Sequence, residues 1–193
     1  MSKRRVVFLD RDGTLNRDVG YPGHFGQIHF YPAAADAVRK LKESGYAAVV
    51  ITHQSGVGLG YFTEESLSDL HRQFAAALAG EGARLDGIYY CPHHPDSPDE
   101  TYRRDCSCRK PRPGLLLRAA SELNLDLEGC AMIGDKVDDI LLGRSVGARS
   151  ILVLTGYGKE ARGILAESPR PPDFIADGIL QAVDWVLGAG EGR

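Results

Sequence analysis

The chain divides into short, continuous apolar runs and longer segments in which apolar residues recur with helical spacing. The continuous runs predict strands buried on both faces, and they cover residues 6–9, 46–51, 88–90, 131–133 and 150–154. A short sixth strand is expected at Phe174 and Ile175. The segments with helical spacing predict helices, and they cover residues 33–44, 63–79, 113–123, 138–146 and 179–187.

This alternation of strands and helices predicts an α/β fold: a single Rossmann-like domain in three layers. Its mostly parallel sheet is expected to be covered by helices on both faces. The length of 193 residues fits one domain over residues 1–193, and residues 188–193 are expected to form a flexible tail. In such a sheet the working residues gather at the carboxyl ends of the strands. The sequence places these residues there: Asp10, Thr52, Cys91 and Asp135.

Composition narrows the class of function. The net charge of -3 provides no basic surface for a nucleic acid. No apolar run approaches the roughly 20 residues that cross a bilayer, and the apolar stretch after the basic start is too short for a signal peptide. We therefore expect a cytoplasmic monomer without a nucleic-acid or membrane partner. In the cytoplasm the four cysteines are expected to be metal ligands or buried thiols rather than disulfides.

Two carboxylates follow the first predicted strand directly, in the sequence Asp10-Arg11-Asp12-Gly13-Thr14. Carboxylates this close repel one another and lose hydration, so the pair needs a compensating cation. A purely structural alternative is an Asx turn with a helix cap. In the functional interpretation, Asp10 attacks phosphorus and forms an acyl phosphate. Asp12 protonates the leaving alkoxide and later takes a proton from water, and Gly13 lets the backbone approach the phosphate.

This element resembles the first motif of the haloacid dehalogenase superfamily, and the other motifs of that family follow in order. Thr52 matches the Ser or Thr after the next strand, and Lys110 matches the motif lysine. The resemblance implies that Thr52 and nearby amides hold phosphoryl oxygens, while Lys110 offsets the charge of Asp10 and the phosphoryl group. Asp135 matches the acidic motif. It would bind a catalytic Mg²⁺ ion together with the Asp10 carboxylate and the Asp12 backbone carbonyl.

A second cluster combines cysteines with histidine on a polar loop. It consists of two close groups: Cys91-Pro92-His93-His94 and Cys106-Ser107-Cys108. Three thiols and an imidazole suit a tetrahedral zinc ion. The expected ligands are Cys91, His93, Cys106 and Cys108. His94 is the alternative fourth ligand, and free surface thiols are the alternative to a metal. Four protein ligands close the coordination sphere, so the zinc would be a structural staple for the loop over residues 91–108. Cys130 is expected in the core.

The zinc loop narrows the resemblance to the D-glycero-D-manno-heptose 1,7-bisphosphate 7-phosphatase family. The string Cys-Pro-His-His-Pro over residues 91–95, and the long stretch before the second cysteine pair, favour that family. The neighbouring histidinol-phosphate phosphatase family is the alternative enzyme, and a non-catalytic zinc-binding module is the alternative outside catalysis. The resemblance implies a small phosphorylated sugar as substrate. Because no long insertion follows the first motif, no cap domain is expected and the site would be open.

The same resemblance implies which residues contact the substrate. Its sugar-site segment matches Asp18, Gly20 and Tyr21, which in a plainer interpretation only shape a loop. Arg109 would bind the sugar or its second phosphate, because guanidinium binds phosphate in a bidentate way. The remaining expected contacts come from the motif residues and their neighbours: Thr52, His53, Gln54, Ser55 and Lys110. The family usually has Asn where His53 stands. Because histidine changes its protonation near neutral pH, this departure makes the sugar specificity uncertain.

Overall fold

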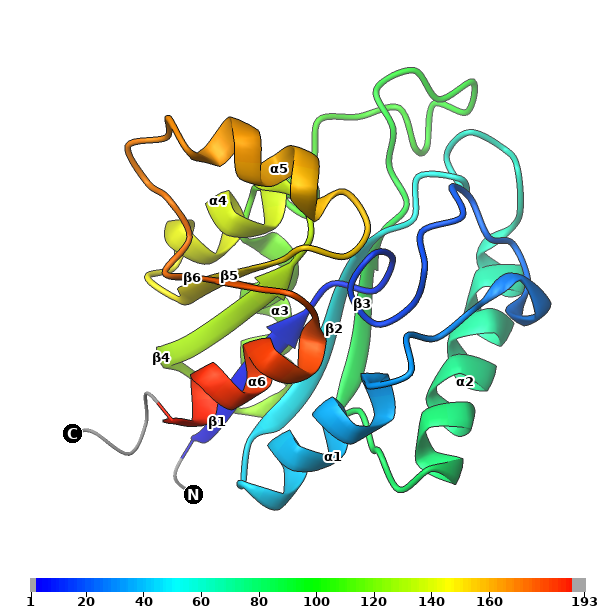
Figure 1. Ribbon diagram of the computed structural model, residues 1–193. Helices are drawn as coiled ribbons and strands as arrows, with labels where there is room; N and C mark the ends of the chain where they lie inside the picture. Colours follow the sequence, from blue (N-terminus) through cyan, green and yellow to red (C-terminus); the bar gives the residue numbers. More distant parts are fainter. Residues whose placement is uncertain (1–2, 189–193) are drawn as a thin grey trace.

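The computed structural model describes residues 3–188 as one α/β domain built around a six-stranded sheet (Figure 1). The strand order is β3-β2-β1-β4-β5-β6, and every neighbouring pair is parallel. The strands are β1 (Arg4–Leu9), β2 (Ala47–His53), β3 (Gly87–Cys91), β4 (Leu125–Gly134), β5 (Arg149–Val153) and β6 (Phe174–Ala176). The predicted α/β fold with a parallel sheet is therefore confirmed.

Helices cover both faces of the sheet. Apolar side chains of α1, α2 and α6 pack on one face, and those of α3, α4 and α5 pack on the other. No helix within residues 3–188 has the length and the apolar character that crossing a bilayer requires. The α-helices are α1 (Ala34–Glu43), α2 (Glu64–Gly80), α3 (Gly114–Leu123), α4 (Val137–Ser145), α5 (Gly158–Leu165) and α6 (Ile179–Gly188), and a 3-10 helix, η1, spans Phe25–Gln27.

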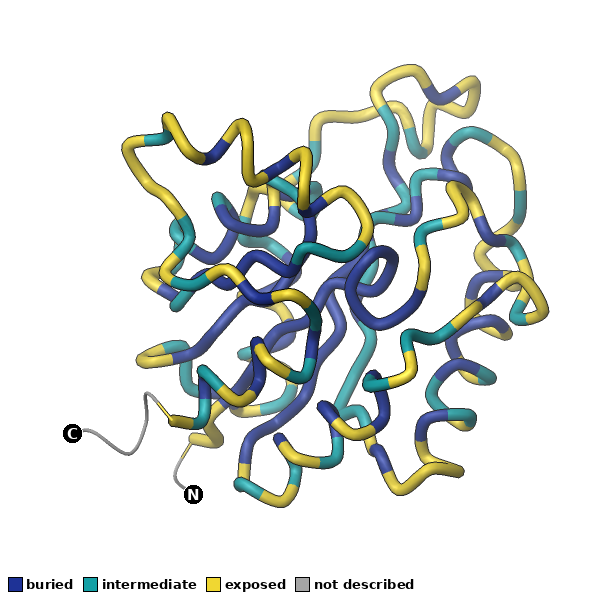
Figure 2. The backbone as a smooth tube through the Cα atoms, in the orientation of Figure 1, coloured by how far each residue is buried: buried dark blue, intermediate teal, exposed yellow. Residues whose placement is uncertain are grey.

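Strand β1 explains why the apolar runs are continuous. Successive side chains of a strand point to opposite faces of the sheet. Val7 and Leu9 pack with the α1 and α6 layer, whereas Val6 and Phe8 pack with the α3 and α4 layer. All four are completely buried. Because both faces are covered, no position of the strand has to be polar, and the buried strands run through the centre of the molecule (Figure 2).

The structure differs from the sequence-based expectation in three places. Helix α5 is not predicted, because it is only 8 residues long and its apolar face is correspondingly brief. Strand β4 begins six residues before the predicted start at residue 131, since its first part pairs with Arg4 and Arg5 of β1 before the register shifts between Arg5 and Val7. Gly188, expected to start a flexible tail, instead ends α6. Residues 189–193 lie outside the described part of the chain.

Three neighbouring strands end at the same edge of the sheet. Leu9 of β1 pairs with Val50 of β2 on one side and with Ile133 of β4 on the other. The polar residues at the ends of these strands therefore meet at one place, and they are Asp10, Thr52 and Asp135.

Candidate active site

Three buried carboxyl groups form the centre of the site. Asp10 follows β1, Asp135 follows β4, and Asp139 lies in the first turn of α4. Their carboxylate oxygens lie within 4.8 Å of one another, and all three residues are buried. Carboxylates repel at this separation, so the group requires cations. The sequence motif predicts Asp10 and Asp135 as metal ligands but does not single out Asp139, although Asp139 belongs to the same acidic segment.

Lys110 supplies one of these cations. Its Nζ donates to Asp10 Oδ1 and to Asp139 Oδ1, each at 2.6 Å, and only 5% of its side chain is exposed. Burial alone would lower the pKa of Lys110, but the charges of Asp10 and Asp139 outweigh burial and raise that pKa above its ordinary value. The lysine is therefore charged, and it lies against the carboxylate that it is expected to neutralise.

Asp135 retains one oxygen that no donor reaches. The Tyr157 N–H donates to Asp135 Oδ2 at 2.8 Å, whereas the buried Oδ1 has no hydrogen-bond partner among the described residues. Burial, with the charges of Asp10 and Asp139 nearby, raises the pKa of Asp135 to about 8. A buried oxygen that accepts no hydrogen bond needs another partner. Together with the two neighbouring carboxylates, this oxygen forms a suitable ligand set for a hard divalent cation. The residues present therefore fit Mg²⁺.

Two glycines make room for the Asp135 carboxyl group. A Cβ atom at Gly13 would lie 2.1 Å from Asp135 Oδ2, and one at Gly156 would lie 2.2 Å from the same oxygen. Their φ values are 88° and 52°, a region in which side chains are strained. Thr155 Oγ1 donates to the Gly13 carbonyl at 2.6 Å, so a hydrogen bond links the segment after β5 to the loop after β1.

Asp12 lies beside the cluster but is held by other partners. Its Oδ2 accepts from Arg11 Nε at 3.1 Å, from Arg11 Nη2 at 2.8 Å and from Gln54 Nε2 at 3.0 Å. Its Oδ1 accepts from Asn16 Nδ2 at 2.8 Å. Asp12 also lines both hollows of the site. It therefore stands between Asp10 and the space beside it, where a general acid for a leaving group is required.

The carboxyl end of β2 and the residue after it add further polar groups. Thr52 Oγ1 accepts from Gln54 Nε2 at 3.0 Å. His53 Nε2 accepts the backbone N–H of Lys110. Burial, together with the charges of Lys110 and Arg109, lowers the pKa of His53 to about 2. The expectation that His53 changes its protonation near neutral pH is therefore wrong, because the ring stays neutral as a hydrogen-bond acceptor.

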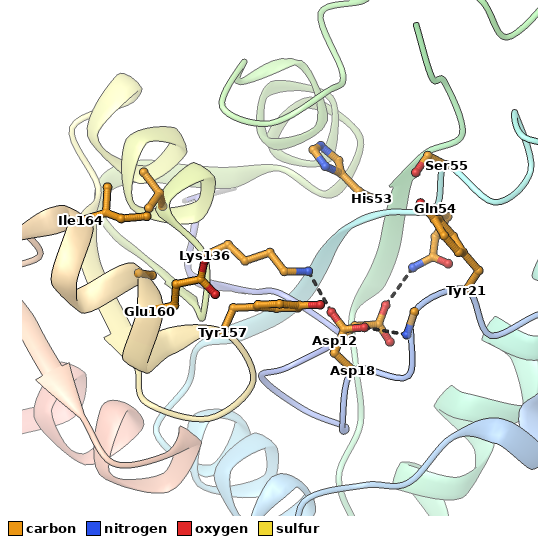
Figure 3. Close-up of a pocket in the computed structure, with 13 residues that line it drawn as sticks. Asp12, Asp18, Tyr21, His53, Gln54, Ser55, Lys136, Tyr157, Glu160 and Ile164 are labelled. Atoms are coloured by element: carbon orange, nitrogen blue, oxygen red, sulfur yellow. Dashed lines mark hydrogen bonds and ion pairs between the residues drawn. The ribbon is translucent and has the colours of Figure 1, made fainter. Parts of the chain in front are cut away.

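Two adjacent hollows contain these groups. The smaller one, of about 40 Å³, is lined by Asp10, Thr52 and Lys110 among others. The larger one has a volume of about 480 Å³ and is called the outer pocket below (Figure 3). The residues that line both are Asp12, His53 and Lys136. A phosphoryl group at Asp10 would therefore have the rest of its molecule in the outer pocket.

The outer pocket has two opposite walls (Figure 3). One carries the residues expected from the sequence, which are Asp18, Gly20, Tyr21, Gln54 and Ser55. The other carries residues that the sequence does not predict, which are Lys136, Tyr157, Glu160 and Ile164. Lys136 Nζ reaches across to Asp18 Oδ2 at 2.9 Å. Glu160 and Ile164 of the second wall belong to α5, and no motif marks that helix in the sequence.

Arg109 does not lie where the resemblance implies. Its Nη1 donates to the backbone carbonyl of His93 at 3.0 Å, and it is absent from the residues that line the two hollows. In this structure Arg109 therefore binds the cysteine-bearing loop and does not reach the space beside Asp10.

The four expected zinc ligands are gathered at one point. One ligand atom from each of Cys91, His93, Cys106 and Cys108 lies within 4.8 Å of all the others. Cys108 Sγ is 3.2 Å from His93 Nδ1 and 3.1 Å from Cys91 Sγ. This donor set is compatible with tetrahedral zinc. The alternative ligand His94 instead accepts the Asp96 N–H at its Nδ1. Cys130 is buried in the core, as expected.

Comparisons with known proteins show which family the chain resembles. A family model described as HAD-hydrolase-like matches residues 107–182. The chain is 46% identical to the D-glycero-beta-D-manno-heptose-1,7-bisphosphate 7-phosphatase of Pasteurella multocida, over 96% of this chain and 98% of that one. It is 41% identical to the enzyme of the same name from Escherichia coli, over 95% of this chain and 88% of that one.

Solved structures extend the comparison to three dimensions. The D,D-heptose 1,7-bisphosphate phosphatase from B. bronchiseptica, complexed with magnesium and phosphate, matches with a TM-score of 0.83 and 27% identity, over 96% of this chain and 99% of that one. The enzyme of the same name from Burkholderia thailandensis matches with a TM-score of 0.68 and 26% identity, over 95% of this chain and 99% of that one.

Proposed function

This chain belongs to the D-glycero-beta-D-manno-heptose-1,7-bisphosphate 7-phosphatase family of haloacid dehalogenase-like hydrolases, and we infer that it removes the 7-phosphate of a heptose 1,7-bisphosphate with the help of Mg²⁺. The product would serve the synthesis of lipopolysaccharide precursors. The observation that carries this inference is the contact of Lys110 with Asp10 beside a carboxylate oxygen of Asp135 that lacks a donor. Together they form a place for a nucleophile, a counter-charge and a metal ion.

Asp10 acts as the nucleophile in the proposed mechanism. One oxygen of its carboxylate attacks phosphorus in line with the leaving oxygen and forms an aspartyl phosphate, which splits one displacement into two easier steps. Lys110 Nζ, held between Asp10 and Asp139, faces the negative charge that gathers there. Thr52 would hold a phosphoryl oxygen at the same small hollow. Fixed charges of this kind need no reorganisation during the reaction and so lower its barrier.

Asp12 acts as general acid and then as general base. Its carboxyl group gives a proton to the leaving sugar oxygen in the first step, and its carboxylate removes a proton from the water that attacks the aspartyl phosphate in the second. Its position on both hollows supports this assignment, since the sugar oxygen would lie where they meet.

The proposed Mg²⁺ site consists of the carboxylates of Asp10 and Asp135 and the backbone carbonyl of Asp12. The oxygen of Asp135 that lacks a donor supports this ligand set, and a related phosphatase structure contains magnesium and phosphate. When bound, the ion neutralises charge on the transferring phosphoryl group. Asp139 would stay outside this set, because one of its oxygens accepts from Lys110 and the other from the Lys136 N–H.

The sugar would lie in the outer pocket. Asp18, Gly20, Tyr21, Gln54 and Ser55 offer one polar wall, and Glu160 faces them from α5 (Figure 3). A contact between Arg109 and the sugar or its second phosphate requires that Arg109 release the His93 carbonyl that it holds in this structure. A monomeric state, a cytoplasmic location and the absence of a nucleic-acid or membrane partner stay predictions from the sequence.

Comparing two substrates tests the proposed function. With Mg²⁺ present, we expect kcat/KM for heptose 1,7-bisphosphate to exceed that for histidinol phosphate by at least about 100-fold. The reason is that polar groups of the site that pair with the sugar would lose their partners when histidinol phosphate binds instead. Phosphorus NMR of the product checks that the 1-phosphate is retained, and a chelator of divalent ions should stop phosphate release.

A preference for histidinol phosphate would overturn the assignment of the substrate, and a protein inactive on both esters would favour the non-catalytic module.

We also propose that the four-residue Cys–His cluster binds a structural zinc ion. Lys110 lies two residues after the ligand Cys108, so the metal would fix the segment that delivers the catalytic lysine. Four protein ligands leave no open coordination position, which argues against a catalytic role for this ion.

Metal analysis of two cysteine variants tests the zinc site. We expect one zinc ion per chain in the wild type and in Cys130→Ala, whose thiol is buried in the core away from the cluster. Cys108→Ser should lose the zinc, and its kcat should fall by about 10-fold or more, as is typical when support of a catalytic group is removed. Full zinc content in Cys108→Ser would contradict the proposed ligand set.

A further inference from the structure

Arg11 is a charged side chain that the mechanism described so far does not use. It stands between the two motif aspartates, and it is fully buried, with 0% of its surface exposed. A buried guanidinium is costly unless its nitrogens find hydrogen-bond partners. Here Nε and Nη2 donate to Asp12, and Nη1 is 3.0 Å from Nε2 of His71. The arrangement is therefore a chain of contacts, from α2 through Arg11 to the proposed general acid.

His71 is the outer end of this chain of contacts. It lies on the buried side of α2, and 8% of the residue is exposed. Burial and the charge of Arg11 lower the pKa of His71 to about 3, so the ring is neutral. Because a guanidinium only donates, Nε2 must accept and the ring proton must be on Nδ1. His71, which in the sequence looks like an ordinary helix residue, is thus the acceptor for the third nitrogen of Arg11.

The hydrogen bonds make the two oxygens of Asp12 different. Oδ2 accepts three donors, two from Arg11 and one from Gln54. Among residues 3–188, Oδ1 accepts only one donor, from Asn16. A carboxyl oxygen has two lone pairs, so Oδ2 has none left for a proton. Oδ1 still has one, and it is therefore the oxygen that can carry the proton of the acid form.

We propose that Arg11 and His71 are positioning residues, which occupy Oδ2 of Asp12 and thereby reserve Oδ1 for the proton that is delivered to the leaving group. This inference rests on the proposed function only in requiring hydrolysis of a phosphate monoester through Asp10 and Asp12. The two donors of Arg11 converge on Oδ2 and hold that oxygen in place, and His71 in turn holds the guanidinium group through Nη1. Lysine in place of Arg11 would keep the charge but lose the planar fork.

The proton transfer is balanced within the first step. As the bond between Asp10 and phosphorus forms, the bond between phosphorus and the leaving oxygen breaks, and that oxygen keeps the electron pair. The proton on Asp12 Oδ1 moves to this oxygen, so the sugar leaves with a neutral hydroxyl group there and Asp12 becomes a carboxylate opposite Arg11. A nitrophenolate ion is stable without that proton. Loss of Asp12 positioning should therefore slow alkyl esters far more than nitrophenyl esters.

The test compares kcat/KM for an alkyl ester and an aryl ester, because this parameter reports the first chemical step. The alkyl esters are heptose bisphosphate and glycerol phosphate, and the aryl ester is p-nitrophenyl phosphate. For Arg11→Lys we expect the alkyl values to fall by about 10-fold or more, and the aryl value to change by less than about threefold. Circular dichroism and the unfolding midpoint establish that the variant is folded.

Variants of His71 keep the test valid if Arg11→Lys does not fold. His71→Leu removes the acceptor for Arg11 Nη1, and we expect a loss of about three- to tenfold that is confined to the alkyl esters. His71→Gln restores an acceptor oxygen, and its alkyl values should return to within about twofold of the wild type. Arg72→Ala is the matched control on the same helix, since Arg72 is exposed and pairs with its helix neighbour Asp69.

The outcomes separate this inference from the proposed function. Equal losses on both kinds of ester, or no loss in Arg11→Lys and His71→Leu, would overturn the positioning role. A wild type that hydrolyses glycerol phosphate but not heptose bisphosphate would reject the proposed substrate, while the ratio of alkyl to aryl values would still decide the role of Arg11. A wild type that hydrolyses no ester would reject both proposals.

Discussion

We expect Asp10→Asn to lower the rate of phosphate release from a sugar phosphate by at least about 10⁴-fold. Losses of this size are seen when one of several residues that act together in catalysis is removed. The amide cannot form the acyl phosphate, although its size is nearly that of the carboxylate. The fold should survive, because Lys110 keeps Asp139 as a partner and one of three mutually repelling carboxylates is gone. A phosphate assay together with a denaturant unfolding curve provides the two measurements.

An acid-quench experiment adds a direct view of the intermediate. Wild-type protein quenched during turnover should carry one phosphoryl group, detected by mass spectrometry on the peptide that contains Asp10, and the Asp10→Asn protein should carry none. Asp36→Asn is the matched control, since Asp36 is an exposed residue of α1. Retained turnover in Asp10→Asn would reject the covalent mechanism.

Lys110→Met should have the second largest effect, because it acts on both catalysis and folding. Removing one partner of a buried ion pair leaves an uncompensated charge, which costs about 3–5 kcal/mol of unfolding free energy. Here two buried carboxylates, Asp10 and Asp139, would lose their shared cation. The lost electrostatic stabilisation should also lower kcat by about 10²- to 10³-fold. Urea unfolding in a chelator measures the stability without help from a metal ion.

A matched substitution on the surface provides the comparison. Lys40 also pairs with an aspartate, Asp184, but both side chains are 48% exposed. Lys40→Met should therefore cost less than about 1 kcal/mol. Adding Asp139→Asn to Lys110→Met should recover part of the lost stability, because the pair is coupled. Equal costs for the two lysine substitutions would show that Lys110 does not compensate a buried charge.

The sequence predicted those parts of the site that are local in the chain. The proposed zinc ligands occur as two short groups on one loop, and their gathering in the structure agrees with that prediction. The loop after β1 carries its two aspartates within three residues, so one strand positions both. The buried strands were predictable because both faces of the sheet are covered, which makes their apolar runs continuous.

The parts that the sequence did not predict depend on contacts between distant segments. His71 looks like any residue of an amphipathic helix until the fold brings it to Arg11. Glu160 and Ile164 belong to a helix too short to give a clear apolar period, yet they line the outer pocket. Asp139 was inside a recognised acidic segment, but only the path of the loop carrying Lys110 decides which of the neighbouring aspartates it meets.

Gly13 and Gly156 limit how this chain can vary. The two positions lie far apart in the sequence, yet a Cβ atom at either would collide with the same oxygen of Asp135. Because the collision is with a residue that the proposed chemistry needs, no compensating change at Asp135 can relieve it without removing the proposed metal ligand. Evolution and laboratory diversification alike are therefore confined to glycine at both places, even though Gly156 belongs to no recognised motif, and sequence variation has to accumulate in the walls of the outer pocket instead.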